Sequence, residues 1–131
     1  MERTLIIIKP DGVARCLTGK IVQRIEDKGL TITKMVKTTL ETPKVEAHYA
    51  HLKDRPFFSD LVAYMTTGPV ILLEVSGENV IQVMRNLAGP TDSCKAPAGT
   101  IRGDFGTSVT QNVIHASDSV EAAESELQRF F

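Results

Sequence analysis

Two short apolar runs constrain how this chain can fold more than any other feature. Residues 4–8 are aliphatic and β-branched and are followed by the turn signal Pro10-Asp11-Gly12, and residues 70–75 form the strongest strand pattern in the sequence. The first run breaks at Lys9 after four apolar residues, far too short for a signal-peptide core or a membrane span. We therefore predict two buried strands and a cytoplasmic protein.

The remaining segments alternate between helix and strand patterns. In chain order we expect a helix capped by Thr18 and ended by Gly29, a strand over 31–40, helices started by Pro43, over 56–65 and over 79–87, a loop over 88–99, a strand over 112–115 and a helix over 119–130. The order strand, helix, strand, strand, helix, strand, with added helices, is that of a split βαβ pattern. It predicts an α+β fold: a ferredoxin-like βαββαβ sandwich with an antiparallel four-stranded sheet.

Apolar stripes indicate which faces of these elements are buried. The strand over 31–40 is expected to place one face on the core. The stripe of the helix after Pro43 consists of Val45, His48, Tyr49 and Leu52, and that of the last helix consists of Val120, Ala123, Leu127 and Phe130. The loop over 88–99, which contains Gly and Pro, is a candidate functional segment.

The overall composition is that of one globular domain over residues 1–131. The chain has 42% hydrophobic and 24% charged residues, and no segment resembles a linker, a tail or a repeat. Its formal net charge of −1 provides no general field for a polyanion, which argues against a dedicated nucleic-acid binder but leaves small anionic ligands open. Cys16 and Cys94 lack C-x-x-C spacing and are expected to be reduced thiols.

Three local patterns suggest other functions and fail on their own chemistry. The glycines at 12 and 19 are separated by six residues where a P-loop has four, and Ile21 replaces its hydroxyl residue. His48 and His51 lie one helical turn apart, but no glutamate accompanies them as in H-E-x-x-H, so we expect solvent-facing histidines rather than a metal site. Residues 101–106 resemble an RNA-recognition signature, yet Asp104 puts negative charge where a phosphate must pass.

The segment Asn112-Val113-Ile114-His115-Ala116-Ser117-Asp118-Ser119 raises the question of whether His115 is a nucleophile at a strand end. A lone histidine in such a place is more often structural. Phosphoryl transfer needs a nucleophile together with cations and donors that hold the transferred group. Such groups occur in several separate segments: Lys9, Arg85, Thr91, Arg102 and Asn112. They make a site only if the fold brings them together.

Four separated motifs carry a resemblance to a known family. They are Ile8-Lys9-Pro10-Asp11-Gly12-Val13, His51-Leu52-Lys53-Asp54-Arg55-Pro56-Phe57-Phe58, Gly99-Thr100-Ile101-Arg102-Gly103-Asp104-Phe105 and the segment around His115. In this order and at this spacing they closely resemble the nucleoside diphosphate kinase family over almost the whole chain. The resemblance implies transfer of the γ-phosphate of a nucleoside triphosphate to a nucleoside diphosphate by a ping-pong mechanism.

The resemblance also implies the catalytic groups. His115 is similar to the family's phosphorylated histidine, which attacks the γ-phosphate through Nδ1, and Glu126 is similar to the carboxylate that holds the other ring nitrogen. A carboxylate on Nε2–H leaves the Nδ1 lone pair free and stabilises the positive charge that develops on attack. Lys9 and Asn112 are the further catalytic residues that the resemblance implies.

Nucleotide contacts follow from the same resemblance. The implied phosphate and sugar ligands are Lys9, Tyr49, Arg85, Thr91, Arg102 and Asn112, with Lys9 and Asn112 also reaching the ribose. Phe57 is similar to the residue on which the base stacks, and Val109 to the apolar contact on its other face. Mg²⁺ is the implied cofactor; it bridges the nucleotide phosphates without direct protein ligands, with Asp118 in contact through water.

The sequence departs from the family pattern in two places. Ala116 stands where the family has glycine, which adds a methyl next to His115 but no charge, so we expect activity to survive. The loop over 89–99 also differs from that of common members, in which it helps to build oligomer contacts. The resemblance implies a homo-oligomer, a hexamer or a tetramer, that uses all bases with ribose or deoxyribose and forms no stable nucleic-acid complex and no membrane association. The alternative is a ferredoxin-like regulatory module that binds nucleotides without turnover, which would need cations but no oriented imidazole.

Overall fold

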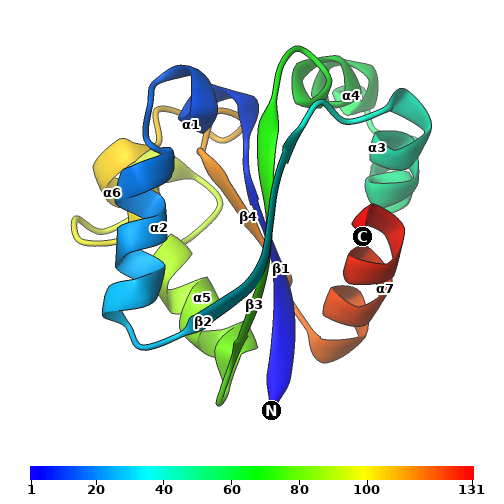
Figure 1. The fold of residues 1–131 in the computed structure, drawn as a ribbon. Coiled ribbons are helices and arrows are strands. Elements are labelled where there is room, and N and C mark those ends of the chain that lie inside the picture. Colours follow the sequence, from blue (N-terminus) through cyan, green and yellow to red (C-terminus); the bar gives the residue numbers. More distant parts are fainter.

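The computed structural model describes residues 1–131 and contains one four-stranded sheet (Figure 1). Its strands are β1 (Glu2–Ile8), β2 (Thr31–Thr38), β3 (Val70–Gly77) and β4 (Ile114–Ala116). Their order across the sheet is β2-β3-β1-β4, and every neighbouring pair is antiparallel. The predicted antiparallel, ferredoxin-like sheet is confirmed.

Helices cover both faces of this sheet. They are α1 (Pro10–Ala14), α2 (Thr18–Asp27), α3 (Thr42–His48), the 3-10 helix η1 (Ala50–Leu52), α4 (Phe58–Met65), α5 (Val80–Ala88), the 3-10 helix η2 (Ser93–Lys95), α6 (Ile101–Phe105) and α7 (Val120–Phe130). In Figure 1, α1, α2, α5 and α6 lie on one side of the sheet, and α3, α4 and α7 on the other. None of these helices has both the length and the apolar character that a bilayer crossing requires.

Strand β1 sits in the middle of the fold because its side chains supply both cores. Ile6 and Ile8 pack with apolar residues of α2 and α5, whereas Leu5 and Ile7 pack with apolar residues of α3, α4 and α7. All four side chains are completely buried. Successive side chains of a strand point to opposite faces, so this aliphatic run is the form that a strand buried on both faces takes. The segment that follows β1 is therefore held in a fixed position.

Two short helices differ from the sequence-based expectation. The turn signal Pro10-Asp11-Gly12 begins helix α1, with proline at its first position, where the missing N–H costs nothing. A Cβ at Gly12 would lie 2.9 Å from Ile8 and 3.1 Å from the carbonyl oxygen of Val113, so glycine allows α1 to pack closely. Helix α6 was not expected at all.

Other differences concern the ends of elements. Leu17 is the N-cap of α2, and Thr18, the expected cap, is its first helical residue. The expected strand over 112–115 lies at Ile114–Ala116, because Val113 has a positive φ of 63° that a strand does not allow. Gly29, with φ of 83°, ends α2 as predicted.

The predicted burial is wrong in part for two elements, strand β2 and helix α7. Strand β2 pairs only with β3 at the sheet edge, and Met35 and Val36 are 52% and 44% exposed, so most of this strand has no face on the core. On α7, Ala123, Leu127 and Phe130 are buried, but Val120 in the first turn is 49% exposed. Core contacts begin one turn later in that helix.

Candidate active site

His115 on β4 lies at the centre of the candidate site. The ladder with β1 places it opposite Ile7, so the central strand of the sheet holds its backbone. Its Nε2 atom lies 2.9 Å from Oε1 of Glu126 on α7. The same oxygen accepts a 2.7 Å hydrogen bond from the hydroxyl of Ser117, which accepts one of 3.1 Å from the backbone N–H of Leu5. The imidazole is therefore oriented by a chain of hydrogen bonds that ends on β1.

The ionisation of Glu126 decides which ring nitrogen is free. Burial raises the pKa of this carboxyl, but the hydrogen bond and charge of His115, the Ser117 hydroxyl and His48 outweigh burial and hold the pKa below its ordinary value. An ionised carboxylate only accepts hydrogen bonds, so the hydrogen between the two groups belongs to Nε2 of His115. In the neutral ring Nδ1 then carries a lone pair, which is what a nucleophile requires.

A strained residue precedes the strand that carries His115. Val113 is fully buried and has φ of 63°, a conformation rare for a β-branched residue. Its backbone N–H donates to Oδ2 of Asp11 at 3.2 Å, and its carbonyl accepts from the backbone N–H of Lys9 at 2.8 Å. Asp11 also accepts a hydrogen bond from the hydroxyl of Tyr64 on α4. These bonds support a sharp change of direction two residues before His115.

Lys9 and Asn112 form a buried polar pair beside this turn. Lys9 Nζ donates to Oδ1 of Asn112 at 2.8 Å, and the amide of Asn112 donates to the carbonyls of Thr91 and Val109 at 3.0 and 2.9 Å. Burial lowers the pKa of Lys9 to about 8, with a further decrease from the charge of Arg102 and a smaller opposing effect of Asp11. Lys9 is therefore cationic at neutral pH, at the inner end of the 89–99 loop.

Arg102 on α6 is a second buried cation. Its Nη1 donates to the carbonyl of Gly89 at 2.8 Å and its Nη2 to the carbonyl of Ile114 at 2.7 Å, whereas its buried Nε has no partner within the chain. Burial, and then the charge of Arg85, lower its pKa to about 10, while Tyr49 acts in the opposite direction. The side chain therefore retains its charge and ties the loop after α5 to the strand that carries His115.

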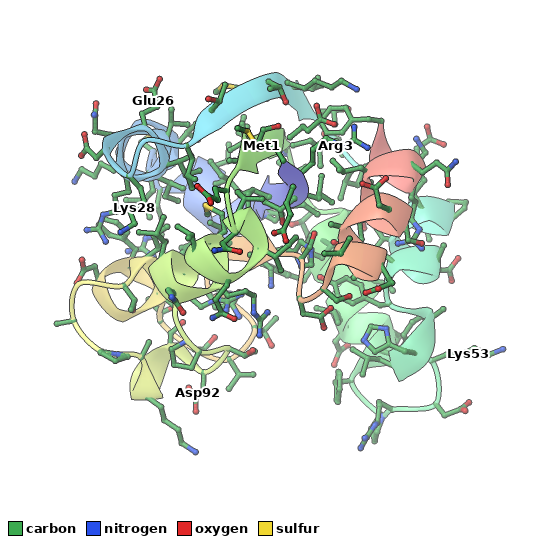
Figure 2. The ribbon with its side chains drawn as sticks, turned by 90° about the horizontal axis from the view of Figure 1, so that it is seen from below. Met1, Arg3, Glu26, Lys28, Lys53 and Asp92 are labelled. Atoms are coloured by element: carbon green, nitrogen blue, oxygen red, sulfur yellow. The ribbon has the colours of Figure 1, made fainter.

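A cleft of about 540 Å³ adjoins these polar groups. Its lining residues are Lys9, Tyr49, Leu52, Phe57, Asp60, Leu61, Thr91, Val109, Thr110 and Asn112. Phe57 and Val109 are 48% and 55% exposed, which is unusual for large apolar side chains. Figure 2 shows Lys53, before α4, and Asp92, after α5, at the outer tips of two segments that contribute to this lining, both pointing away from the body of the molecule. The cleft thus combines two exposed apolar side chains, Phe57 and Val109, with one buried cation, Lys9.

His48 on α3 is the residue for which the sequence-based interpretation was wrong. It was expected to face solvent with His51, but His48 is buried and only His51 is exposed. The His48 ring meets the rings of His115, Tyr49 and Phe130 edge to face, at centroid distances of 4.8, 4.6 and 5.3 Å. It therefore forms a wall of the pocket that holds the His115 imidazole.

The whole described chain matches one protein family. The sequence model of the family described as nucleoside diphosphate kinase matches residues 2–131. The chain belongs to the nucleoside diphosphate kinase family. It is a phosphotransferase, and its reaction is transfer of the γ-phosphate of a nucleoside triphosphate to a nucleoside diphosphate.

Individual relatives agree with this assignment. Nucleoside diphosphate kinases from Archaeoglobus fulgidus and Streptomyces avermitilis are 50% and 52% identical over 131 residues, covering 100% and 99% of this chain and 87% and 96% of those proteins. The crystal structure of nucleoside diphosphate kinase from Encephalitozoon cuniculi has a TM-score of 0.98 at 42% identity, covering 100% of this chain and 89% of that chain. The structure of the Halobacterium salinarum kinase in complex with CDP has a TM-score of 0.97 at 42% identity, covering 99% and 87%. The fold and family predicted from the motifs are confirmed.

The fold brings most of the predicted site residues of the kinase together. His115 contacts Glu126, and Lys9, Asn112, Thr91 and Val109 are joined by hydrogen bonds. Tyr49 and Phe57 line the same cleft as Lys9. Arg102 binds the carbonyl of Gly89, two residues before Thr91, and its charge acts on Lys9, whereas Arg85 and Asp118 are exposed.

Three residues that have no role in the sequence-based prediction contribute to the candidate site. Ser117 holds Glu126, Asp11 holds the turn at Val113, and His48 packs on His115. Ser117 and Asp11 both lie within the quoted motifs, so position in a motif was the available signal. His48 lies three residues before His51, with which the second motif begins, and its membership of an apolar stripe was the signal of its burial.

Proposed function

We propose that this kinase works through a covalent phosphohistidine at His115. In the first half-reaction the Nδ1 lone pair attacks the γ-phosphorus of a nucleoside triphosphate, the bond from that phosphorus to the bridging oxygen breaks, and the diphosphate leaves. In the second half-reaction a terminal β-phosphate oxygen of another diphosphate attacks the same phosphorus, and the N–P bond breaks. The first product leaves before the second substrate binds, so the kinetics are ping-pong.

The hydrogen bond between His115 and Glu126 carries this proposal. A module that only binds nucleotides needs cations, but it gains nothing from an imidazole held in one tautomer by a carboxylate that a third group orients. As His115 is phosphorylated, positive character develops on its ring, and the anion on Nε2–H stabilises it.

Cations and donors around the cleft support the assignment of the nucleotide contacts. Lys9, Arg85, Arg102, Thr91 and Asn112 hold phosphates and sugar in this proposal, and Arg102 offers a buried Nε without a partner to a phosphate oxygen. Burial and then the charge of Glu126 raise the pKa of Tyr49, so its hydroxyl stays protonated and can donate. Phe57 and Val109, both exposed at the cleft mouth, take the two faces of the base.

Phosphoryl transfer from nucleotides generally uses a divalent metal ion, and Mg²⁺ is the ion proposed here. The cleft lining contains one carboxylate, Asp60, and therefore no cage of several acidic ligands. This fits Mg²⁺, which keeps most of its water and binds chiefly through substrate phosphates. Asp118, exposed just after β4, is proposed to contact the ion through water. When bound, the ion neutralises charge that develops on the phosphate oxygens.

Labelling with γ-³²P ATP tests the mechanism. The expected result is one label per chain that is acid-labile and base-stable and that is absent from His115→Ala. Folded protein that exchanges phosphate between nucleotides without ever becoming labelled would exclude the covalent intermediate. Folded protein that binds nucleotides with no exchange and no label would instead favour the regulatory module.

The proposal extends to assembly and location. We take residues 1–131 as one kinase domain that forms a homo-oligomer, a hexamer or otherwise a tetramer, in the cytoplasm, without a stable complex with nucleic acid. The exposed apolar residues Met35 and Val36 on the edge strand β2 support self-association. Light scattering at micromolar concentration is expected to give six or four chains, and a monomer would contradict this part.

A further inference from the structure

His48, His115 and Glu126 form a three-residue cluster that the phosphotransfer reaction does not need as a set. His115 and Glu126 take part in the proposed chemistry, whereas His48 has no partner in it. One ligand atom from each residue, an imidazole nitrogen or a carboxylate oxygen, lies within 4.8 Å of the other two. The shortest separation is 2.9 Å, from His115 Nε2 to Glu126 Oε1, and His48 Nδ1 lies 4.0 Å from Glu126 Oε2.

This arrangement has the composition of a transition-metal site. Two imidazoles and one carboxylate are a ligand set for Zn²⁺ and related ions, whereas Mg²⁺ prefers oxygen ligands and retained water. Ligand atoms of a tetrahedral zinc site lie about 3.3 Å apart, given zinc bond lengths of about 2.0–2.1 Å. The observed separations bracket that value, so small movements of the three side chains are enough to close the site.

We propose that His48, His115 and Glu126 bind Zn²⁺ as an inhibitory site that captures the nucleophile. The metal takes the place of the hydrogen between His115 Nε2 and Glu126, with His48 as the third ligand and the fourth position left to water. The site is distinct from the phosphate-bound Mg²⁺ in both ligands and metal preference.

Coordination of the metal at Nε2 of His115 inactivates this residue as a nucleophile because it changes the tautomer of the ring. The Nε2 lone pair forms the metal bond, so the proton of the neutral ring moves from Nε2 to Nδ1, and the ring releases no proton overall. The Nδ1 lone pair becomes an N–H bond and cannot attack phosphorus. This consequence rests on the proposed role of His115, whereas metal binding by itself does not.

Two cations near the cluster limit its affinity. Arg129 Nη1 lies 3.4 Å from His48 Nδ1 and gives up this contact when a metal binds. Lys9 is also close enough for its charge to act on His48. Repulsion by these groups sets the site apart from a permanent structural zinc centre and fits a reversible inhibitor.

The chain provides matched controls for a metal-binding test. His51 is exposed and lies three residues from His48, and the exposed thiols of Cys16 and Cys94, which also bind Zn²⁺, can be removed together. In the Cys16→Ser, Cys94→Ser background, His48→Phe keeps an aromatic ring in the pocket but removes one ligand, and His51→Phe makes the same exchange at the surface. Unfolding curves verify that both variants fold.

Co²⁺ titration, followed by visible absorption, reports binding without any assay of activity. We expect one Co²⁺ per chain with a tetrahedral or five-coordinate spectrum in the background and in His51→Phe, and at least tenfold weaker binding in His48→Phe. Equal spectra and affinities in the two phenylalanine variants would overturn the site. This readout stays valid even if the phosphohistidine proposal fails.

Two further measurements connect the metal to the nucleophile. In buffered free Zn²⁺ with saturating MgATP, the background and His51→Phe should be inhibited at a concentration at least tenfold lower than His48→Phe, each relative to its own metal-free rate, and a chelator should restore activity. In ¹⁵N spectra of the background protein, Zn²⁺ should shift the ring nitrogens of His48 and His115 and move the proton of His115 to Nδ1, while His51 is unchanged. Shifts confined to His51 would refute the proposal even if His48→Phe does not fold.

Discussion

The carboxylate of Asp11 holds the backbone of Val113, with Oδ2 at 3.2 Å from the backbone nitrogen. The bond joins the start of α1 to the strained residue that precedes β4, and Asp11→Ala leaves a buried N–H without its acceptor. We expect unfolding measurements to show a loss of about 1–3 kcal/mol. We also expect kcat to fall about 10-fold to 100-fold, because a small displacement of the turn moves His115 away from the phosphate.

Tyr64→Phe is the matched control for this prediction. It removes the two hydrogen bonds of the Tyr64 hydroxyl with Asp11, one donated to the carboxylate and one accepted from the backbone N–H, and leaves the bond from Val113 to the carboxylate in place. Its kcat should stay within about threefold of wild type, because the hydrogen bonds that it removes are remote from the reacting atoms. An equal fall of kcat in both variants would show that the turn at Val113 is not what positions the nucleophile.

Substitutions at His115, Glu126 and Ser117 should give a graded series of losses in turnover. His115→Ala is expected to lower kcat by about 10⁵ or more, because no other group forms the covalent intermediate. Glu126→Ala should cost about 10²–10⁴, since the imidazole remains but loses orientation and charge stabilisation. Ser117→Ala removes one hydrogen bond to Glu126 and should cost about tenfold.

Steady-state kinetics and phosphoenzyme formation check this series. Glu124, exposed on the same helix and paired with Arg3, which is labelled in Figure 2, is the matched control, and its alanine variant should be as active as wild type. Equal losses at His115 and Glu126 would contradict their assigned roles.

The lowered pKa of Lys9 predicts a loss of activity at alkaline pH. Its pKa of about 8 means that the free enzyme loses this cation as pH rises, so kcat/KM for MgATP should fall about tenfold per pH unit above pH 8. The effect of Lys9 on stability has the opposite sign. Between about pH 8 and its ordinary pKa of 10.5, Lys9 is protonated in the unfolded chain but not in the folded chain. Within this range Lys9 therefore makes the free energy of unfolding rise with pH. Lys9→Met should be weakly active and lack the alkaline limb. A wild-type profile that stays flat to pH 9.5 would rule out this role.

The lowered pKa of His48 predicts that the protein loses stability at acid pH. Burial, and then the charge of His115, lower its pKa from 6.5 to about 3, although Glu126 opposes this. Below pH 6.5 the unfolded chain takes up a proton that the folded chain excludes, so stability falls as pH decreases, by about 2 kcal/mol at pH 5. The lowered pKa of Glu126 adds a loss of the same sign at still lower pH.

Urea unfolding at pH 7.5 and pH 5 measures this difference. The decrease in unfolding free energy should be smaller by about 2 kcal/mol in His48→Phe than in wild type. His51→Phe, at an exposed position, should behave as wild type. If His48→Phe loses as much stability as wild type between the two pH values, His48 is not excluded from protonation in the fold.

The base site predicts broad specificity. In the proposed base site, Phe57 and Val109 contact the two faces of the base, and these faces are present in every base, so stacking of about 1–3 kcal/mol does not discriminate between bases. Phe57→Ala should raise KM about tenfold or less with base preference nearly unchanged. The test is kcat/KM for ADP, GDP, CDP, UDP and their deoxy forms, with wild type and variant. A preference above about 10⁴-fold for one base would require a polar group that reads its edge.

Elements whose sequence pattern reflects burial were predictable. Both faces of β1 and β3 are buried. A strand that is buried on both faces has a continuous run of aliphatic residues, so the runs at 4–8 and 70–75 indicate these strands. Helices α1 and α6 have five residues each, contain Gly12 and Gly103, and depend on contacts from elsewhere in the chain. In α6 the Thr100 hydroxyl accepts from the backbone N–H of Gly103, and any Cβ there would strike the carbonyl of Pro97. The local pattern of apolar residues does not reflect such contacts, so it could not predict α1 and α6.

The site was predictable through motifs but not through chemistry alone. Glu126 is one of several acidic residues on α7, and only the docking of that helix against β4 distinguishes it from Glu124. The burial of His48 depends in the same way on tertiary contacts, because Phe130 of α7 and His115 of β4 both pack against its ring. Such pairings join residues far apart in the chain, so a single sequence shows the candidates but not their partners.

The strand order β2-β3-β1-β4 has a consequence for biosynthesis. When a ribosome has translated α6, the chain already contains the cations Lys9, Arg85 and Arg102, but the central strand β1 still has one unpaired edge. His115, the proposed nucleophile, is translated only with β4, and its partner Glu126 later still, with α7. A nascent kinase therefore cannot carry out this chemistry before its last strand docks beside its first, and completion of the sheet is a precondition of catalysis.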